Sequence, residues 1–174
     1  NVLSRLLDKP LIPVHHILGH VFSPNLTTEI EFPYLALVVS GGHTELVYCK
    51  DQMSFQTIGS PRDDAVGEVY DKVAKKLELP YPGGPIIDQL AQKGRAIYQF
   101  TSPKIEDPLA FSFSGVKSAV INLMNTMNQR NEEFLKEDIA KSFQSFVVSE
   151  LLTKLKRALA KYPVKMVGLC GGVS

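Results

Sequence analysis

Residues 34–51, YLALVVSGGHTELVYCKD, contain the clearest structural pattern of this chain. An apolar run over residues 35–39 meets a polar turn over residues 40–44, and the chain then returns in apolar alternation. Two apolar runs separated by paired glycines predict a β-hairpin. The turn itself has two interpretations. It is either a polar surface turn or a place where backbone N–H groups converge on an anion.

The residues around this hairpin predict an α/β fold. A third strand is expected over residues 55–59, and a helix over residues 63–79 with Asp63 or Asp64 as its N-cap. An apolar strand over residues 165–170 then enters another glycine turn. Three antiparallel strands, then helices, then an apolar strand are typical of one ribonuclease-H-like lobe. Further predictions are a short strand over 11–16, a glycine turn at Gly83–Gly84, and helices over 86–96, 116–127 (capped by Ser114) and 131–162.

Composition is that of an ordinary globular protein. Of the 174 residues, 44% are hydrophobic and 21% charged, and the net charge is +1. No global positive field therefore indicates nucleic acid, so any RNA contact must come from a local patch or a partner. By charge alone, the candidates for such a patch are Lys75, Lys76, Lys104 and Lys117.

The cysteines and the ends of the chain bear on its cellular setting. The two cysteines, Cys49 and Cys170, lie far apart in apolar runs, which predicts free buried thiols and a reducing compartment. No apolar run approaches the length of a membrane span, so we expect a cytoplasmic protein without a membrane partner.

The chain starts without Met inside a helical pattern and ends just after a strand. We therefore expect a fragment of a longer protein.

His16 and His20 form a candidate metal site. Histidines four residues apart on a helix share one face and can bind a single metal ion. A metal site requires at least three protein ligands, so the alternative is a pair of partly exposed histidines at the end of a strand. His43 could share the site, because all four histidines lie between residues 15 and 43.

Three glycine pairs, Gly41–Gly42, Gly83–Gly84 and Gly171–Gly172, suggest a ligand cleft. Glycine lets the backbone approach a ligand closely, and converging N–H groups favour phosphate. Asp71 or Asp88 could accept hydrogen bonds from ribose hydroxyls. The alternative for the carboxylates Asp64, Glu68 and Asp71 is a solvated helix face.

Six motifs together resemble the TsaD family of tRNA threonylcarbamoyladenosine synthesis proteins, formerly described as O-sialoglycoprotein endopeptidases. In order, they are VHHILGH (14–20), LVVSGGHT (37–44), DDAVGEVYDK (63–72), YPGGP (81–85), FSFSGVK (111–117) and GGVS (171–174). The resemblance implies the actin/Hsp70/sugar-kinase fold of two ribonuclease-H-like lobes, here partial. Residues 1–32 would be the tail of the first lobe, and residues 33–174 most of the second, with a helical insertion over about 86–162.

The resemblance also implies an activity: transfer of a threonylcarbamoyl group from threonylcarbamoyl-AMP to the N6 amine of the adenosine 3′ to the anticodon, in tRNAs reading ANN codons. His16 and His20 match metal ligands, with iron implied and zinc or magnesium as alternatives. The matching substrate-binding residues are Val38, Val39, Ser40, Gly41, Gly42, Asp71, Gly84 and Asp88; no catalytic residue is assigned. The family's phosphate loop would precede Asn1, and its third metal ligand would follow Ser174, so we expect these 174 residues alone to be inactive.

The resemblance also implies partners: tRNA, threonylcarbamoyl-AMP and, in bacteria, TsaB-like and TsaE-like proteins.

Three alternative functions are weighed against the same residues. A non-catalytic scaffold paralogue of the same fold would have no need of the histidine pair. A metallopeptidase, as in the old family description, would need a glutamate placed as general base beside the histidines, and none follows His16. A sugar or acetate kinase on this fold would leave the histidines unexplained.

Overall fold

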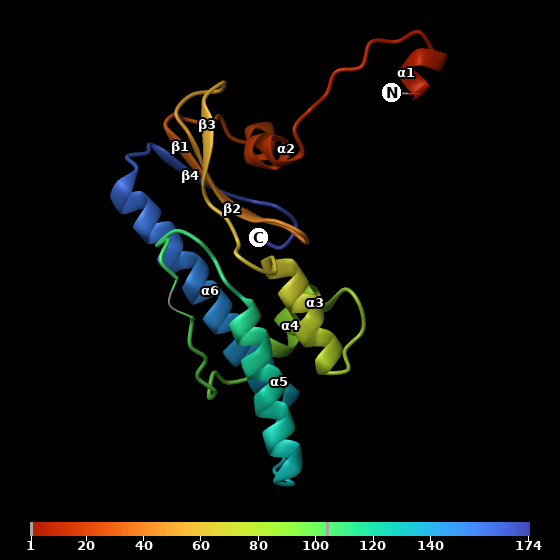
Figure 1. Cartoon of the computed structure of the whole chain (residues 1–174), viewed down its shortest axis with the longest axis vertical. Helices are drawn as coiled ribbons and strands as arrows, with labels where there is room; N and C mark the ends of the chain where they lie inside the picture. Colours follow the sequence, from red (N-terminus) through yellow and green to blue (C-terminus); the bar gives the residue numbers. More distant parts are fainter. Residues whose placement is uncertain (1, 104) are drawn as a thin grey trace.

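A mixed sheet forms the upper part of the molecule (Figure 1). The computed structural model describes residues 2–103 and 105–174, so Lys104 lies outside the described residues. The strand order is β3-β2-β1-β4, with β1 at Tyr34–Val39, β2 at Thr44–Cys49, β3 at Phe55–Gly59 and β4 at Met166–Cys170. β1 pairs antiparallel with β2 and parallel with β4. The predicted hairpin, third strand and final strand are confirmed, and so is the α/β class.

β1 lies at the centre of the fold because both of its faces are covered. All six of its residues are buried. Successive side chains of a strand point to opposite faces, so Leu35, Leu37 and Val39 enter one core while Tyr34, Ala36 and Val38 enter another. This burial on both faces explains why the strand is apolar throughout and does not alternate.

Four helices build the larger core, on the face of Leu35. They are α3 (Val66–Lys76), α4 (Gly83–Ala91), α5 (Ser114–Gln129) and α6 (Lys136–Lys161). α3 contributes a valine stripe, and α6 contributes Ile139, Phe143 and Val147. The helices extend away from the sheet and give the molecule its long axis (Figure 1).

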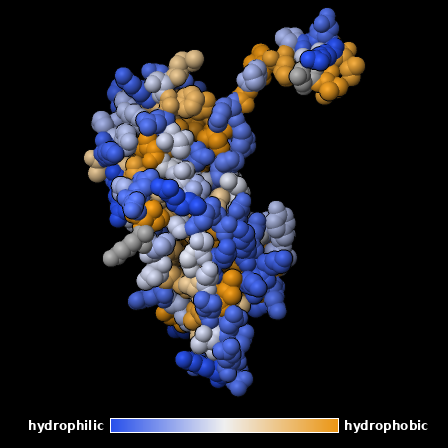
Figure 2. Space-filling model, in the orientation of Figure 1, coloured by the Kyte–Doolittle hydropathy of each residue, from blue (hydrophilic) through white to orange (hydrophobic). Residues whose placement is uncertain are grey.

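One short helix covers the opposite face of the sheet. α2 (His16–Phe22) places Ile17 and Val21 in the smaller core and is followed by the 3-10 turn η1 (Ser23–Leu26). The helix α1 (Val2–Leu6) buries no residue and stands away from the body (Figure 1). Apolar residues are visible on this arm in Figure 2.

The strand predicted over residues 11–16 is wrong. Residues 9–15 are exposed and form neither helix nor strand, and His16 already belongs to α2. Pro10 and Pro13 remove two backbone donors from this run, which weakens it as a strand. An apolar run without a partner strand among the described residues therefore stays extended.

Three details of the helix starts also differ from the predictions. α3 begins at Val66, whose N–H is accepted by Thr44 Oγ1 at 2.9 Å, so neither Asp63 nor Asp64 caps it. Gly83 and Gly84 are not a turn but the first residues of α4, which follows Pro82 and ends at Ala91. Ser114 is the first residue of α5 and not its cap.

The long helix and the free cysteines agree with the sequence-based predictions. α6 lies within the long helix predicted over residues 131–162. Cys49 and Cys170 are free and buried, as predicted. None of the helices in residues 2–103 and 105–174 combines the length and hydropathy that a membrane span requires. The division of the chain between residues 32 and 33 stays a prediction.

Candidate functional site

The carboxyl ends of β1 and β4 bring two turns to the same edge of the sheet. Because the strands are parallel, the turn after Val39 lies beside the turn after Cys170. Val173 N donates to Val39 O at 3.1 Å and joins the two turns. Within the first turn, Ser40 N donates to His43 O at 2.8 Å and His43 N donates to Ser40 Oγ at 3.2 Å. In α/β sheets, ligands commonly bind beyond this edge.

Close backbone packing holds α3 against the first turn. A Cβ on Gly67 would lie 2.6 Å from Gly41 Cα and 2.8 Å from Ser40 O. Gly171 has a φ of +106°, a conformation that favours glycine, and a Cβ there would collide with Val39 O. The fold itself therefore requires glycine at these two positions.

Four other glycines at this edge have no such explanation. A Cβ added to Gly41, Gly42, Gly84 or Gly172 would meet no atom of the described residues within 4 Å. None of the four has a positive φ. Neither packing nor backbone conformation requires glycine there, so the open space beside them is available to a ligand.

A cavity of about 390 Å³ lies at this edge. It brings Gly84 and Asp88 of α4 together with the turn after β4, and its walls are formed by Tyr70, Gly84, Pro85, Asp88, Gln144, Gly172, Val173 and Ser174. Asp88 is held in place, since its Oδ1 accepts from Gln144 Nε2 at 2.7 Å and its Oδ2 from Gln92 Nε2 at 3.2 Å. The volume falls in the range of small-ligand sites.

Tyr70 and Gln144 are cavity residues that sequence reasoning missed. Burial raises the pKa of Tyr70 to about 12, and the charge of Asp88 acts in the same direction. Its hydroxyl therefore stays protonated near neutral pH. In the sequence, the helical spacing of Tyr70 with neighbouring apolar residues indicates a core position, and no signal singles out Gln144.

The remaining predicted substrate residues have different surroundings. The side chains of Val38 and Val39 are buried in the two cores, so only their backbone could meet a ligand. Gly41 and Gly42 are exposed in the turn. Asp71 does not line the cavity; its Oδ1 accepts from Gly83 N at 2.8 Å and fixes the start of α4. The alternative interpretation of Asp71, as a solvated carboxylate on a helix face, does not account for this hydrogen bond.

Three histidines gather beside the first turn. The ring centroids of His16 and His20 lie 4.7 Å apart, and those of His16 and His43 lie 5.4 Å apart. α2 brings the first two together, and the hairpin turn brings the third. Among the described residues, no group of three His, Cys, Asp or Glu side chains is arranged to hold a metal. The imidazoles nevertheless suit iron or zinc as ligand types, so they fit part of a metal site.

Asp63 and Asp64 connect distant parts of the chain. Asp63 accepts hydrogen bonds from Ser112 Oγ (2.5 Å), Phe113 N (2.8 Å) and Ser114 Oγ (2.7 Å). Burial alone would raise the pKa of this carboxyl, but these hydrogen bonds outweigh it and hold the pKa below its usual value. Asp64 pairs with Lys117 and Lys72, which lowers its pKa. The FSFSG motif is thereby joined to the loop before α3.

Comparison with known proteins identifies the family. The family model TsaD, tRNA N6-adenosine threonylcarbamoyltransferase, matches residues 1–174. A protein of this name from Staphylococcus haemolyticus is 54% identical over 175 residues, which cover 100% of this chain and 51% of the relative. One from Halalkalibacterium halodurans is 55% identical over 166 residues, covering 95% and 48%.

The family model matches the whole chain, although the chain spans about half the length of the curated relatives it matches. The range matched by the family model contains the positions of all six motifs quoted above, among them the histidine pair and the turn after β1. This chain belongs to the TsaD family.

Proposed function

We propose that the complete protein transfers a threonylcarbamoyl group from threonylcarbamoyl-AMP to the N6 amine of the adenosine 3′ to the anticodon, in tRNAs reading ANN codons. Relatives at 54% and 55% identity carry the name tRNA N6-adenosine threonylcarbamoyltransferase. The observation that carries the proposal is the set of four glycines with open space beside them, at the edge where the parallel strands end. A bound adenylate would explain why these positions are glycine.

The residues at this edge suit a nucleotide in complementary ways. Exposed backbone at Gly41 and Gly42 offers N–H groups to an anionic phosphate. Asp88, held by two glutamine side chains, can accept from ribose hydroxyls. Tyr70 keeps its proton and can donate to the ligand. A mixed anhydride is already activated, so orientation of this kind and charge stabilisation suffice to promote acyl transfer.

His16 and His20 are the residues that would hold a metal ion, which we propose to be iron, with zinc or magnesium as alternatives. A bound metal ion supplies Lewis acidity toward carbamate or phosphate oxygens. The contribution of the chain is to place two imidazoles on one face of α2, with His43 close by. Metal analysis of the complete protein tests this proposal: exchanging both histidines for alanine should abolish stoichiometric metal, and retained metal would contradict it.

The wider setting follows from the same proposal. The described residues would form part of the actin/Hsp70/sugar-kinase fold, with the cavity facing the other lobe. We place the complete protein in the cytoplasm, working with TsaB-like and TsaE-like proteins on tRNA. A non-catalytic scaffold on this fold is disfavoured, because it would have no need of the gathered histidines.

Depletion of the complete protein tests the proposed activity. Mass spectrometry of digested tRNA should show loss of threonylcarbamoyladenosine, and the wild-type gene should restore it. Unchanged levels of the modified nucleoside after verified depletion would refute the transferase assignment.

A further inference from the structure

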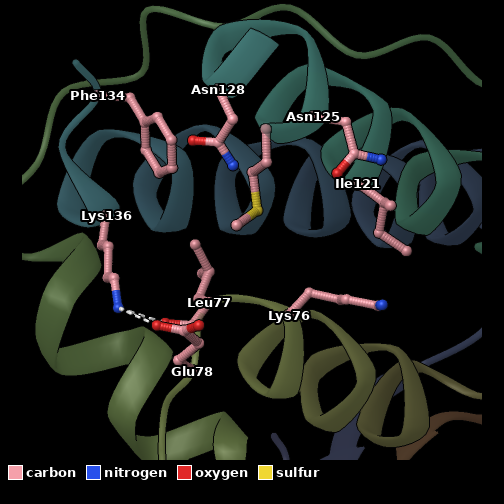
Figure 3. Close-up of a pocket in the computed structure, with 9 residues that line it drawn as sticks. Lys76, Leu77, Glu78, Ile121, Asn125, Asn128, Phe134 and Lys136 are labelled. Carbon is pink, nitrogen blue, oxygen red and sulfur yellow. Dashed lines mark hydrogen bonds and ion pairs between the residues drawn. The ribbon is translucent and has the colours of Figure 1, made fainter. Parts of the chain in front are cut away.

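A second pocket, remote from the sheet edge, lies between the end of α3 and the hairpin of α5 and α6. Its volume is about 350 Å³, which is enough for a planar base. Figure 3 shows Asn125, Asn128 and Phe134 on one side of the opening and Leu77 and Glu78 on the other. The full lining is Lys76, Leu77, Glu78, Ile121, Met124, Asn125, Asn128, Phe134 and Lys136.

The polar groups of this pocket are available to a ligand. Asn125 and Asn128 lie one turn apart on α5, and both are exposed. Their side-chain amides make no hydrogen bond to any other residue that the structure describes. Exposed amides normally hydrogen-bond to water. A ligand in the pocket could replace that water and bind both amides, which point to the pocket from one face of the helix.

The charged side chains of the pocket favour a base over a phosphate as the bound group. Lys136 Nζ donates to Leu77 O at 2.6 Å and lies 3.9 Å from the Glu78 carboxylate, so this lysine is already engaged. Lys76 forms no ion pair within residues 2–103 and 105–174. A carboxylate in the opening disfavours phosphate there but can accept from the amino group of a base. Lys76 remains for the adjoining phosphate.

Aromatic and amide groups are what single-stranded RNA recognition uses. Unpaired bases stack on aromatic rings, and Asn amides bind adenine in a bidentate manner. Phe134 is partly exposed at the pocket, with Met124 and Ile121 beside it. Of the four lysines that charge alone suggested, Lys117 is bound to Asp64, whereas Lys76 lines this pocket.

We propose that this pocket binds one unpaired nucleotide of the RNA substrate, with a base that carries an exocyclic amine. The inference rests on the proposed function, since it assumes that RNA reaches this face. α3 has 11 residues, so the pocket lies roughly 16 Å along the helix from the turn at Gly41. A few nucleotides of a loop can span that separation while another base occupies the sheet edge.

Binding of a tRNA anticodon stem-loop to the complete protein tests the inference. The double variant Asn125→Ala/Asn128→Ala should weaken binding by about 10-fold or more, because a bidentate base contact is lost. Alanine favours helix, so α5 should stay folded. Asn122→Ala is the matched control: it changes an exposed asparagine of the same helix that does not line the pocket.

The identity of the base provides the second readout. Replacing a single loop adenine by purine, or a cytosine by 2-pyrimidinone, removes only the amine. At one position this should weaken binding to the wild type but not to the double variant. Equal affinity of the wild type and the double variant would overturn the inference. A loss that is the same for every base would indicate a contact with the sugar or phosphate only and would also overturn it.

The two proposals can fail separately. If wild-type protein forms threonylcarbamoyladenosine on tRNA and the double variant does so with unchanged KM, the pocket proposal fails and the proposed function stands. If wild-type protein with its partner proteins modifies no tRNA, the proposed function fails. Phe134→Leu, which keeps the apolar packing but removes the ring, should raise KM for tRNA with little change in kcat.

Discussion

Two neighbouring glycines, Gly83 and Gly84, show how differently the same residue type can be used. A Cβ on Gly83 would collide with the Cβ of Ala74 and lie 3.0 Å from Tyr70 O, because the start of α4 packs tightly on α3. A Cβ on Gly84 would meet nothing within 4 Å. Gly83 belongs to the tightly packed contact between α3 and α4, which we call the seam, whereas Gly84 belongs to the wall of the cavity.

The same contrast separates two regions of the molecule. In the seam, where α3 and α4 close on each other and on the turn after β1, Gly67 and Gly83 permit backbone contact. On the rim of the cavity, Gly84 and Gly172 border empty space. The fold accounts for the seam glycines. No contact among the described residues explains glycine on the rim, whereas the proposed ligand would. We therefore expect substitutions in the seam to reduce stability and substitutions on the rim to reduce ligand binding.

Gly67→Ala should cause the largest loss of stability. The added Cβ would lie within 2.6–2.8 Å of backbone atoms of Gly41 and Ser40, which cannot move aside as a flexible side chain would. Overpacking of this kind costs about 1–3 kcal/mol. Chemical denaturation should show this decrease in the free energy of unfolding, and a change below about 0.5 kcal/mol would show that the seam is not tightly packed.

Asp63→Asn should have an intermediate effect, because it weakens the contacts that join the loop before α3 to Ser112 and Ser114. The expected loss is about 1–2 kcal/mol at neutral pH. The folded state lowers the pKa of Asp63 below the unfolded value of about 3.9. The carboxylate therefore stabilises the fold above about pH 4, and this contribution is lost as pH falls through the lower folded pKa.

Denaturation as a function of pH checks this sign. Asp63→Asn should reduce the acid dependence of the free energy of unfolding below about pH 4. Glu31→Gln is the matched control, since Glu31 is exposed and makes no hydrogen bond or ion pair with the described residues. An unchanged acid slope in the Asp63 variant would mean that the three hydrogen bonds do not favour the charged form.

Gly84→Ala should have the smallest effect on stability. The Cβ enters open space, and alanine favours helix over glycine, so the free energy of unfolding should stay within about 0.5 kcal/mol of wild type or rise. Thermal denaturation measures this directly. A marked loss of stability would place Gly84 in the seam and remove the contrast between the two regions.

Local pattern explains which parts of this fold could be predicted from the sequence. The apolar run before Gly41–Gly42 and the alternation after it predicted the hairpin. The four-residue spacing of His16 and His20 predicted a shared face only if the segment was helical, and in α2 it is. These features depend on residues close in sequence. The strand expected at residues 11–16 failed because an apolar run becomes a strand only where a partner strand accepts it.

Contacts between residues far apart in the sequence explain which features could not be predicted from it. The partners of Asp63 lie 49–51 residues away, so the aspartate looked like a helix cap. The three glycine pairs looked alike, although Gly83 is packed and Gly84 is open. Tyr70 of α3 and Gln144 of α6 reach the cavity because both helices pack on α4. Tertiary packing decides which members of a motif face a ligand.

Binding of AMP to the complete protein, measured by calorimetry, tests whether the open glycines border a nucleotide site. Gly84→Leu should weaken binding by about 10-fold or more, because the side chain fills the cavity that Gly84 borders. Gly115→Leu is the matched control, being the second residue of α5 as Gly84 is of α4, and should bind as wild type does. Wild-type affinity in a folded Gly84→Leu protein would show that Gly84 does not border a nucleotide site.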